Sequence, residues 1–77
     1  MQEEQVQYPS SAEIVKYLLY TGVPYGTLAQ SLGVNRSTLY RISIGAQVPR
    51  PALARELEAA YDKRKVEFER FREEARQ

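Results

Sequence analysis

Two residue types on which much protein chemistry depends are missing from this 77-residue chain, which contains no cysteine and no histidine. Their absence excludes disulfides, zinc fingers, Cys–His nucleophile pairs and imidazole acid–base catalysis. Paired carboxylates or an activated lysine would remain for catalysis, but they need a cleft that so short a chain has little room to form. We therefore expect no enzymatic activity and no bound metal, cofactor or small-molecule ligand.

Long apolar runs are also lacking. Hydrophobic residues make up 43% of the chain and charged residues 27%, which is ordinary for a globular protein and too broken by charge for a membrane span. The first seven residues are polar and include Glu3 and Glu4, so they lack the basic start and apolar stretch of a secretory signal. We expect one domain without a membrane segment, located in the cytoplasm.

Acidic residues are missing from the middle of the chain, where none lies between Glu13 and Glu56. Five basic residues fall inside that interval: Lys16, Arg36, Arg41, Arg50 and Arg55. The net charge of +1 therefore conceals a cationic centre between two segments that carry all the acidic residues. Such segregation is typical of a surface that faces phosphate groups, and a chance gap in a short sequence is the alternative.

The first part of the chain predicts an arm followed by a helix. Residues 1–9 show no periodic pattern and end in Tyr8-Pro9, so we expect them to form a flexible arm. Ser10 and Glu13 match the S-x-x-E capping box at a helix start. Apolar residues follow at helical spacing, and Gly22 can end this first helix in a left-handed conformation.

Two short helices and one long helix are predicted next. The second helix is expected over residues 25–32, ended by Gly33. Asn35 is a suitable N-cap for the third helix, which continues to about Ile44 and stops at Gly45.

The remainder predicts a loop and then the long helix. Residues 46–50 form the loop, and Pro51 occupies a first helical turn, where proline is tolerated. The chain is thus expected to be all-α. It would form a compact helix-turn-helix bundle of four helices over residues 10–61, with the last helix continuing over residues 62–77.

The second and third predicted helices have the composition of a helix-turn-helix unit. Two short helices that cross at a steep angle need a very small residue where they approach, and Ala29 meets that need. They also need a turn residue that adopts positive φ, and Gly33 follows four positions later. The core that would fix their angle consists of Leu28, Leu32, Val34, Leu39 and Ile42.

Anchoring of the third helix by Leu39 and Ile42 would turn its opposite face outward. The polar and cationic residues on and beside that face are our candidates for reading DNA bases: Asn35, Arg36, Ser37, Tyr40 and Arg41. Arginine can bond the O6 and N7 atoms of guanine, and serine and asparagine can reach base edges or phosphate oxygens. For any single one of these residues, an ordinary solvated position is the alternative.

The segment from Thr27 to Ile42, with Gly45 and the Pro49-Arg50-Pro51 loop, resembles the lambda-repressor/Cro (Xre-type) helix-turn-helix family over roughly residues 10–61. The resemblance implies that Asn35, Arg36, Ser37 and Arg41 approach bases. It also implies that the second helix and the loop follow the DNA backbone. The candidates there are Tyr25, Thr27, Gln30, Gln47 and Arg50.

A single recognition unit of this size spans about 4 to 6 base pairs, so specific recognition generally takes two units. A homodimer is therefore expected, with a two-fold interface along the end of the last helix. The residues at near-heptad spacing that would form it are Tyr61, Phe68, Phe71 and Ala75. Arg64 interrupts this stripe. Two alternatives stay open: the aromatic residues fold back on the chain's own core, or the end of the helix frays.

Together these patterns predict a sequence-specific transcriptional regulator that binds double-stranded DNA, most simply a repressor of bacterial, phage or plasmid origin that covers a promoter. It would act in the cytoplasm in association with the nucleoid. The alternative is a helix-turn-helix module that binds proteins, such as an antitoxin or an adaptor subunit of a nucleoprotein machine. Binding to duplex DNA that weakens steeply with salt would distinguish a DNA reader from such a module.

Overall fold

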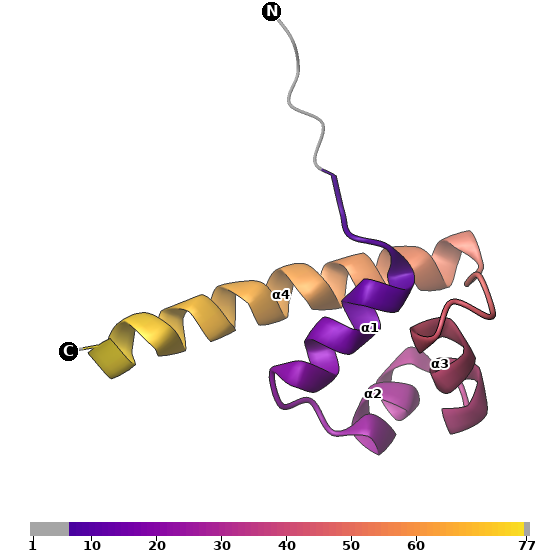
Figure 1. Cartoon of the computed structure of the whole chain (residues 1–77), viewed down its shortest axis with the longest axis horizontal. Coiled ribbons are helices and arrows are strands. Elements are labelled where there is room, and N and C mark those ends of the chain that lie inside the picture. The colour runs from indigo at the N-terminus through magenta and orange to yellow at the C-terminus, as the bar shows by residue number, and fades with distance from the viewer. Residues whose placement is uncertain (1–6, 77) are drawn as a thin grey trace, which may run out of the picture.

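Four α-helices make up the fold of the part of the chain that the structure describes. The computed structural model describes residues 7–76, and Figure 1 shows α1 (Ser11–Tyr20), α2 (Tyr25–Leu32), α3 (Arg36–Ser43) and α4 (Pro51–Arg76). No strand occurs in this part of the chain, so the predicted all-α class is confirmed. Residues 1–6 of the predicted arm lie outside the described residues, as does Gln77 at the other end. None of the four helices has the length and hydropathy that crossing a membrane requires.

The helix boundaries follow local signals in the sequence. Ser10 caps α1, because its Oγ accepts a hydrogen bond from the Glu13 N–H at 3.2 Å while the Glu13 carboxylate accepts one from the Ser10 N–H at 3.3 Å. The reversal after α1 passes through Gly22, whose φ of 103° lies in a region open to glycine. The predicted capping box and glycine stop are therefore confirmed. The predicted bounds of α2 are confirmed as well, and α3 ends at Ser43, next to the predicted end.

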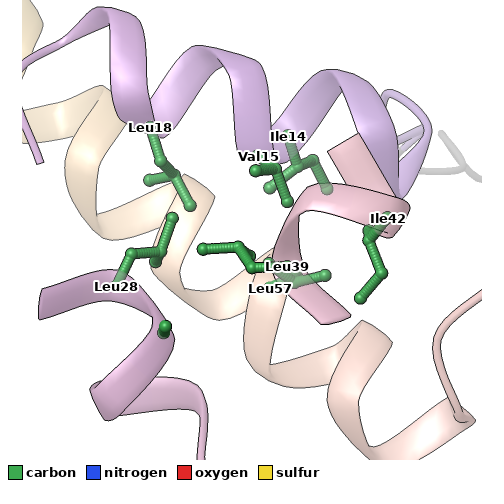
Figure 2. Packing of buried hydrophobic residues seen from close by; sticks show 8 residues of the cluster. Ile14, Val15, Leu18, Leu28, Leu39, Ile42 and Leu57 are labelled. Carbon is green, nitrogen blue, oxygen red and sulfur yellow. The ribbon is translucent and has the colours of Figure 1, made fainter. Parts of the chain in front are cut away.

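The core is one cluster of aliphatic side chains to which every helix contributes, as Figure 2 shows. Its buried members are Ile14, Val15, Leu18, Leu28, Ala29, Leu39, Ile42 and Leu57. Burial of one large aliphatic side chain contributes about 1.5–3 kcal/mol, so this cluster is the main source of stability. Five residues were predicted to form the core of the helix pair. Leu28, Leu39 and Ile42 are buried, whereas Leu32 and Val34 are only half-buried at the edge of the cluster.

Aromatic contacts extend the packing of α1 on α4 beyond this core. The ring of Tyr17 on α1 lies 5.1 Å from that of Tyr61 and 6.4 Å from that of Phe68, measured between centroids, and both pairs are edge-to-face. Tyr8 adds a third edge-to-face contact, 6.2 Å from Tyr61. This geometry is the favourable one for aromatic pairs. Two of the four predicted dimer residues, Tyr61 and Phe68, thus contact α1 of their own chain.

Arg64 ties α4 to the end of α1. Its Nε donates to the hydroxyl of Thr21 at 3.0 Å, and its Nη2 donates to the Thr21 carbonyl. Thr21 is the buried C-cap residue of α1. A cation is favourable there, because the last carbonyls and the helix dipole place negative charge at a helix C-terminus. The arginine that interrupts the apolar stripe in the sequence therefore has a partner within its own chain.

The last turns of α4 continue past α1 and project from the bundle (yellow in Figure 1). Phe71 is 65% exposed on this segment, and Ala75 is exposed as well. These two predicted dimer residues are thus accessible on the surface, unlike Tyr61 and Phe68, which are half-buried.

A strong hydrogen bond holds the segment before α1 against α4. The Tyr8 hydroxyl donates to Oδ2 of Asp62 at 2.5 Å. This hydrogen bond raises the pKa of Tyr8 above its usual 10.0, and partial desolvation and the negative charges of Asp62 and Glu58 act in the same direction. The protonated hydroxyl is therefore favoured in the folded chain.

Raising the pH should release this contact. Because folding raises the pKa of Tyr8, its protonated form contributes stability below pH 10.0, and this contribution is lost as the pH rises through the raised pKa. We would titrate the tyrosines of the wild type and of Tyr8→Phe by ultraviolet absorbance and subtract the second curve from the first. The difference curve should show one tyrosine that ionises with its midpoint above pH 10.0. A difference curve with its midpoint at or below that value would contradict the contact.

Candidate nucleic-acid interface

The turn between α2 and α3 is formed by backbone hydrogen bonds around one glycine. Gly33 ends α2 with a φ of 70°, its N–H donates to the Gln30 carbonyl at 3.1 Å, and the Val34 N–H donates to the Ala29 carbonyl at 3.0 Å. This pair of bonds is the Schellman arrangement, which requires a left-handed residue at Gly33. Ala29 itself is buried, as its predicted place between the helices requires. The turn fixes the direction in which α3 leaves α2.

α3 is anchored by an apolar pair and presents a polar surface on its other side. Leu39 and Ile42 are 0% and 1% exposed in the core. We call the exposed residues on the opposite side the outer face of α3, which consists of Arg36, Ser37, Tyr40 and Arg41. This is the surface that the sequence nominated for contact with DNA bases. It carries two guanidinium groups, a hydroxyl and a phenol.

Asn35, the remaining base-reading candidate, caps α3. Its side-chain Oδ1 accepts a hydrogen bond from the Thr38 N–H at 2.8 Å. The capping oxygen is therefore engaged, and the amide nitrogen is the atom of Asn35 that can donate to another molecule.

Arg36 turns toward α2. A Cβ added at Gly26 would lie 2.7 Å from Nη2 of Arg36, so the guanidinium occupies the space that the glycine leaves open. Tyr25, half-buried beside it, donates its hydroxyl to the Arg36 carbonyl at 3.4 Å. The N-cap residue of α2 is Pro24, which provides no side-chain hydrogen bond. The cationic head of Arg36 and the N-terminus of α2 are thus brought together.

Arg41 is held by two neighbouring side chains. Its Nε donates to Oε1 of Gln47 at 3.0 Å, and its Nη2 donates to the Thr38 hydroxyl at 3.4 Å. The structure therefore joins Arg41, a base-reading candidate, with Gln47, a backbone candidate. The sequence did not lead us to predict a role for Thr38 in the site. Its position one turn before Arg41 on the same helix could have indicated this contact.

The other backbone candidates come from α2 and from the loop before α4. Thr27 and Gln30 are exposed on α2, and Arg50 is exposed at the start of α4, where its carbonyl accepts the Ala54 N–H at 2.8 Å. Gln47 and Arg50 line a common open hollow of about 520 Å³ with half-buried Thr38. Thr27 and Gln30 do not line that hollow.

The surface beside the outer face includes apolar side chains that the sequence interpretation missed. Ile44 is 55% exposed and Val48 is 88% exposed. Among residues 7–76 no group of three or more acidic side chains is placed to hold a metal ion. The candidate site is therefore a polar and cationic surface with an apolar margin.

The chain matches no protein-family model, no curated protein and no solved structure. The resemblance to the lambda-repressor/Cro family therefore depends only on the sequence pattern from Thr27 to Ile42, with Gly45 and the Pro49-Arg50-Pro51 loop. The geometry of α2, the turn and α3 is observed directly in this chain.

Gly26→Ala should displace the Arg36 guanidinium without harming the fold. The added methyl takes the place of Nη2, at the movable end of a flexible side chain, and alanine favours a helix over glycine by up to about 1 kcal/mol. We expect an equal or higher unfolding temperature together with a shifted Arg36 Nε–H resonance, while the Arg41 Nε–H resonance stays in place as the internal control. A lower unfolding temperature or an unmoved Arg36 resonance would show that this packing is wrong.

Proposed function

We propose that this protein is a sequence-specific DNA-binding protein of the helix-turn-helix type, which inserts α3 into the major groove of duplex DNA. The observation that carries the proposal is the outer face of α3, a polar and cationic surface turned outward by the burial of Leu39 and Ile42. A helix with such a face fits the major groove, where base edges present hydrogen-bonding atoms.

The charge distribution supports this proposal. The helix pair and the following loop belong to the interval from Glu13 to Glu56, which contains no other acidic residue. Arg36, close to the N-terminus of α2, is suited to a phosphate group, because helix N-termini and guanidinium groups both attract anions. Arg41 is suited to guanine. We therefore assign Arg36 mainly to the DNA backbone and Arg41 to base recognition.

The biological role that follows from this proposal is transcriptional regulation. A protein of bacterial, phage or plasmid origin that covers a promoter would act as a repressor, associated with the nucleoid in the cytoplasm. A second candidate function is a protein-binding module, such as an antitoxin or a nucleoprotein adaptor, and the exposed Ile44 and Val48 favour it. Apolar side chains beside a polar surface are typical of protein interfaces.

Arg41→Ala tests the proposed function directly. A pool of random duplexes should yield an enriched sequence with the wild type, and on that sequence Arg41→Ala should lose about 1–3 kcal/mol of binding free energy and its preference at one base pair. Fluorescence anisotropy at several salt concentrations measures both the affinity and the number of neutralised phosphates.

Arg70→Ala is the matched control, because Arg70 is an exposed arginine outside α3 that lies about 100° or more around α4 from Phe71 and Ala75, so it should leave binding unchanged. Equal loss on every duplex would assign Arg41 to a phosphate contact. A wild type that enriches no sequence and binds without dependence on salt would favour the protein-binding module and contradict the DNA-binding proposal.

We extend the proposal to a homodimer on DNA, formed through the projecting part of α4. Tyr61 and Phe68 contact Tyr17 of their own chain, which leaves Phe71 and Ala75 as the predicted residues accessible to a second copy. Such a dimer would present two α3 helices to successive major grooves.

Phe71→Glu should weaken this dimer while sparing the fold, since Phe71 is 65% exposed. Burial of one phenylalanine contributes about 1.5–3 kcal/mol, and a two-fold dimer would bury one Phe71 from each copy, so the dimer dissociation constant should rise by at least about 100-fold. Light scattering coupled to size exclusion gives the mass. Val66→Glu is the control, because Val66 is exposed and lies about 140° around the α4 axis from Phe71. A wild type that remains monomeric over the whole concentration range would remove the dimer.

A further inference from the structure

We infer that Gln47 is a positioning residue that holds the guanidinium of Arg41 in place for base recognition, an inference that rests on the proposed DNA-binding function. Gln47 lies in the loop after α3, and its Oε1 accepts a hydrogen bond from Nε of Arg41 at 3.0 Å. The family resemblance implies a phosphate contact for Gln47 instead. The two roles use different atoms, because a phosphate needs the amide N–H as donor whereas Arg41 takes the carbonyl oxygen.

The backbone of the loop brings Gln47 to this position. The N–H groups of Ala46 and Gln47 both donate to the carbonyl of Arg41, at 2.8 Å and 3.2 Å. Gly45 allows the chain to reverse directly after α3, since its φ is 78°. Arg41 and Gln47 are thus joined through main chain and side chains alike. This closed arrangement fixes where the Gln47 oxygen lies relative to α3.

Thr38 provides the second point of attachment, because its hydroxyl accepts from Nη2 of Arg41 at 3.4 Å. With Nε and one N–H of Nη2 directed at acceptors, the plane of the guanidinium is set, and Nη1 together with the second N–H of Nη2 can donate to a base. A long side chain that is ordered before binding loses less conformational entropy when it meets a base. A fixed plane also favours discrimination, because bidentate bonding to guanine needs the guanidinium aligned with the base edge.

Substitutions at Gln47 separate positioning from direct DNA contact. Gln47→Met keeps the approximate size of the side chain and removes the acceptor, whereas Gln47→Glu keeps an acceptor and adds negative charge. At the base pair that Arg41→Ala identifies, Gln47→Met should reduce the preference for the selected base by about two- to tenfold, the range expected for ordering one long side chain. Preferences at the other base pairs should stay unchanged.

Gln47→Glu should keep the preference at that base pair while lowering affinity on all duplexes, because its charge repels phosphate. In the free protein, nitrogen relaxation of Arg41 Nε should show restricted motion in the wild type and in Gln47→Glu and increased motion in Gln47→Met. Gln7→Met, an identical substitution at an exposed position before α1, should match the wild type in every measurement.

An unchanged preference in Gln47→Met overturns the inference. A uniform loss of affinity in that variant assigns Gln47 to a phosphate contact and also overturns the inference. The inference is overturned as well if Gln47→Met and Gln47→Glu both lower the unfolding temperature, because Gln47 would then have a general structural role. If the wild type enriches no sequence, the proposed function fails and this inference fails with it. The wild-type selection therefore tells the two failures apart.

Discussion

The burial of Leu39 and Ile42 is the contact on which the rest of the structure depends. A helix repeats every 3.6 residues, so two anchored side chains on one side fix its rotation about its own axis. The outer face of α3 points away from the core for this reason, and its guanidinium groups are displayed only because the apolar pair beneath them is satisfied. The proposed contact with DNA therefore begins with packing inside the protein.

The helices that pack against α3 are themselves held in place by further contacts. α1 contacts both α3 and α4 and contributes Ile14 and Val15 to the shared cluster. It is also fixed to α4 by the aromatic contacts of Tyr17 and by the hydrogen bonds from Arg64 to its C-cap residue. A chain of this length can bury only a small core, so polar and aromatic contacts at the edge of that core carry a large share of the geometry.

The sequence predicted those features whose causes are local. The capping box at Ser10 and the left-handed turn at Gly33 involve residues within a few positions of one another, and the exposure of α3 follows from its amphipathic spacing. The contacts of Arg64 with Thr21 and of Tyr8 with Asp62 join residues 43 and 54 positions apart, and no periodic pattern marks them. In the candidate site the outward face was predictable, but the directions of its arginines depend on the space over Gly26 and on the oxygen of Gln47.

The shared core also has a consequence for how the chain folds. Leu28 and Leu39 pack in the same cluster as residues of α1 and α4. The α2–α3 pair therefore has no separate hydrophobic core that could stabilise it in isolation. Bringing α1 against α4 costs loop-closure entropy before the buried contacts form, and we expect a small domain with one shared core to fold in a concerted, all-or-none transition. The pair excised as a peptide would expose its apolar side to water and lose its helical conformation. The conformation of the α2–α3 pair is thus thermodynamically inseparable from the packing of α1 and α4 around the shared core.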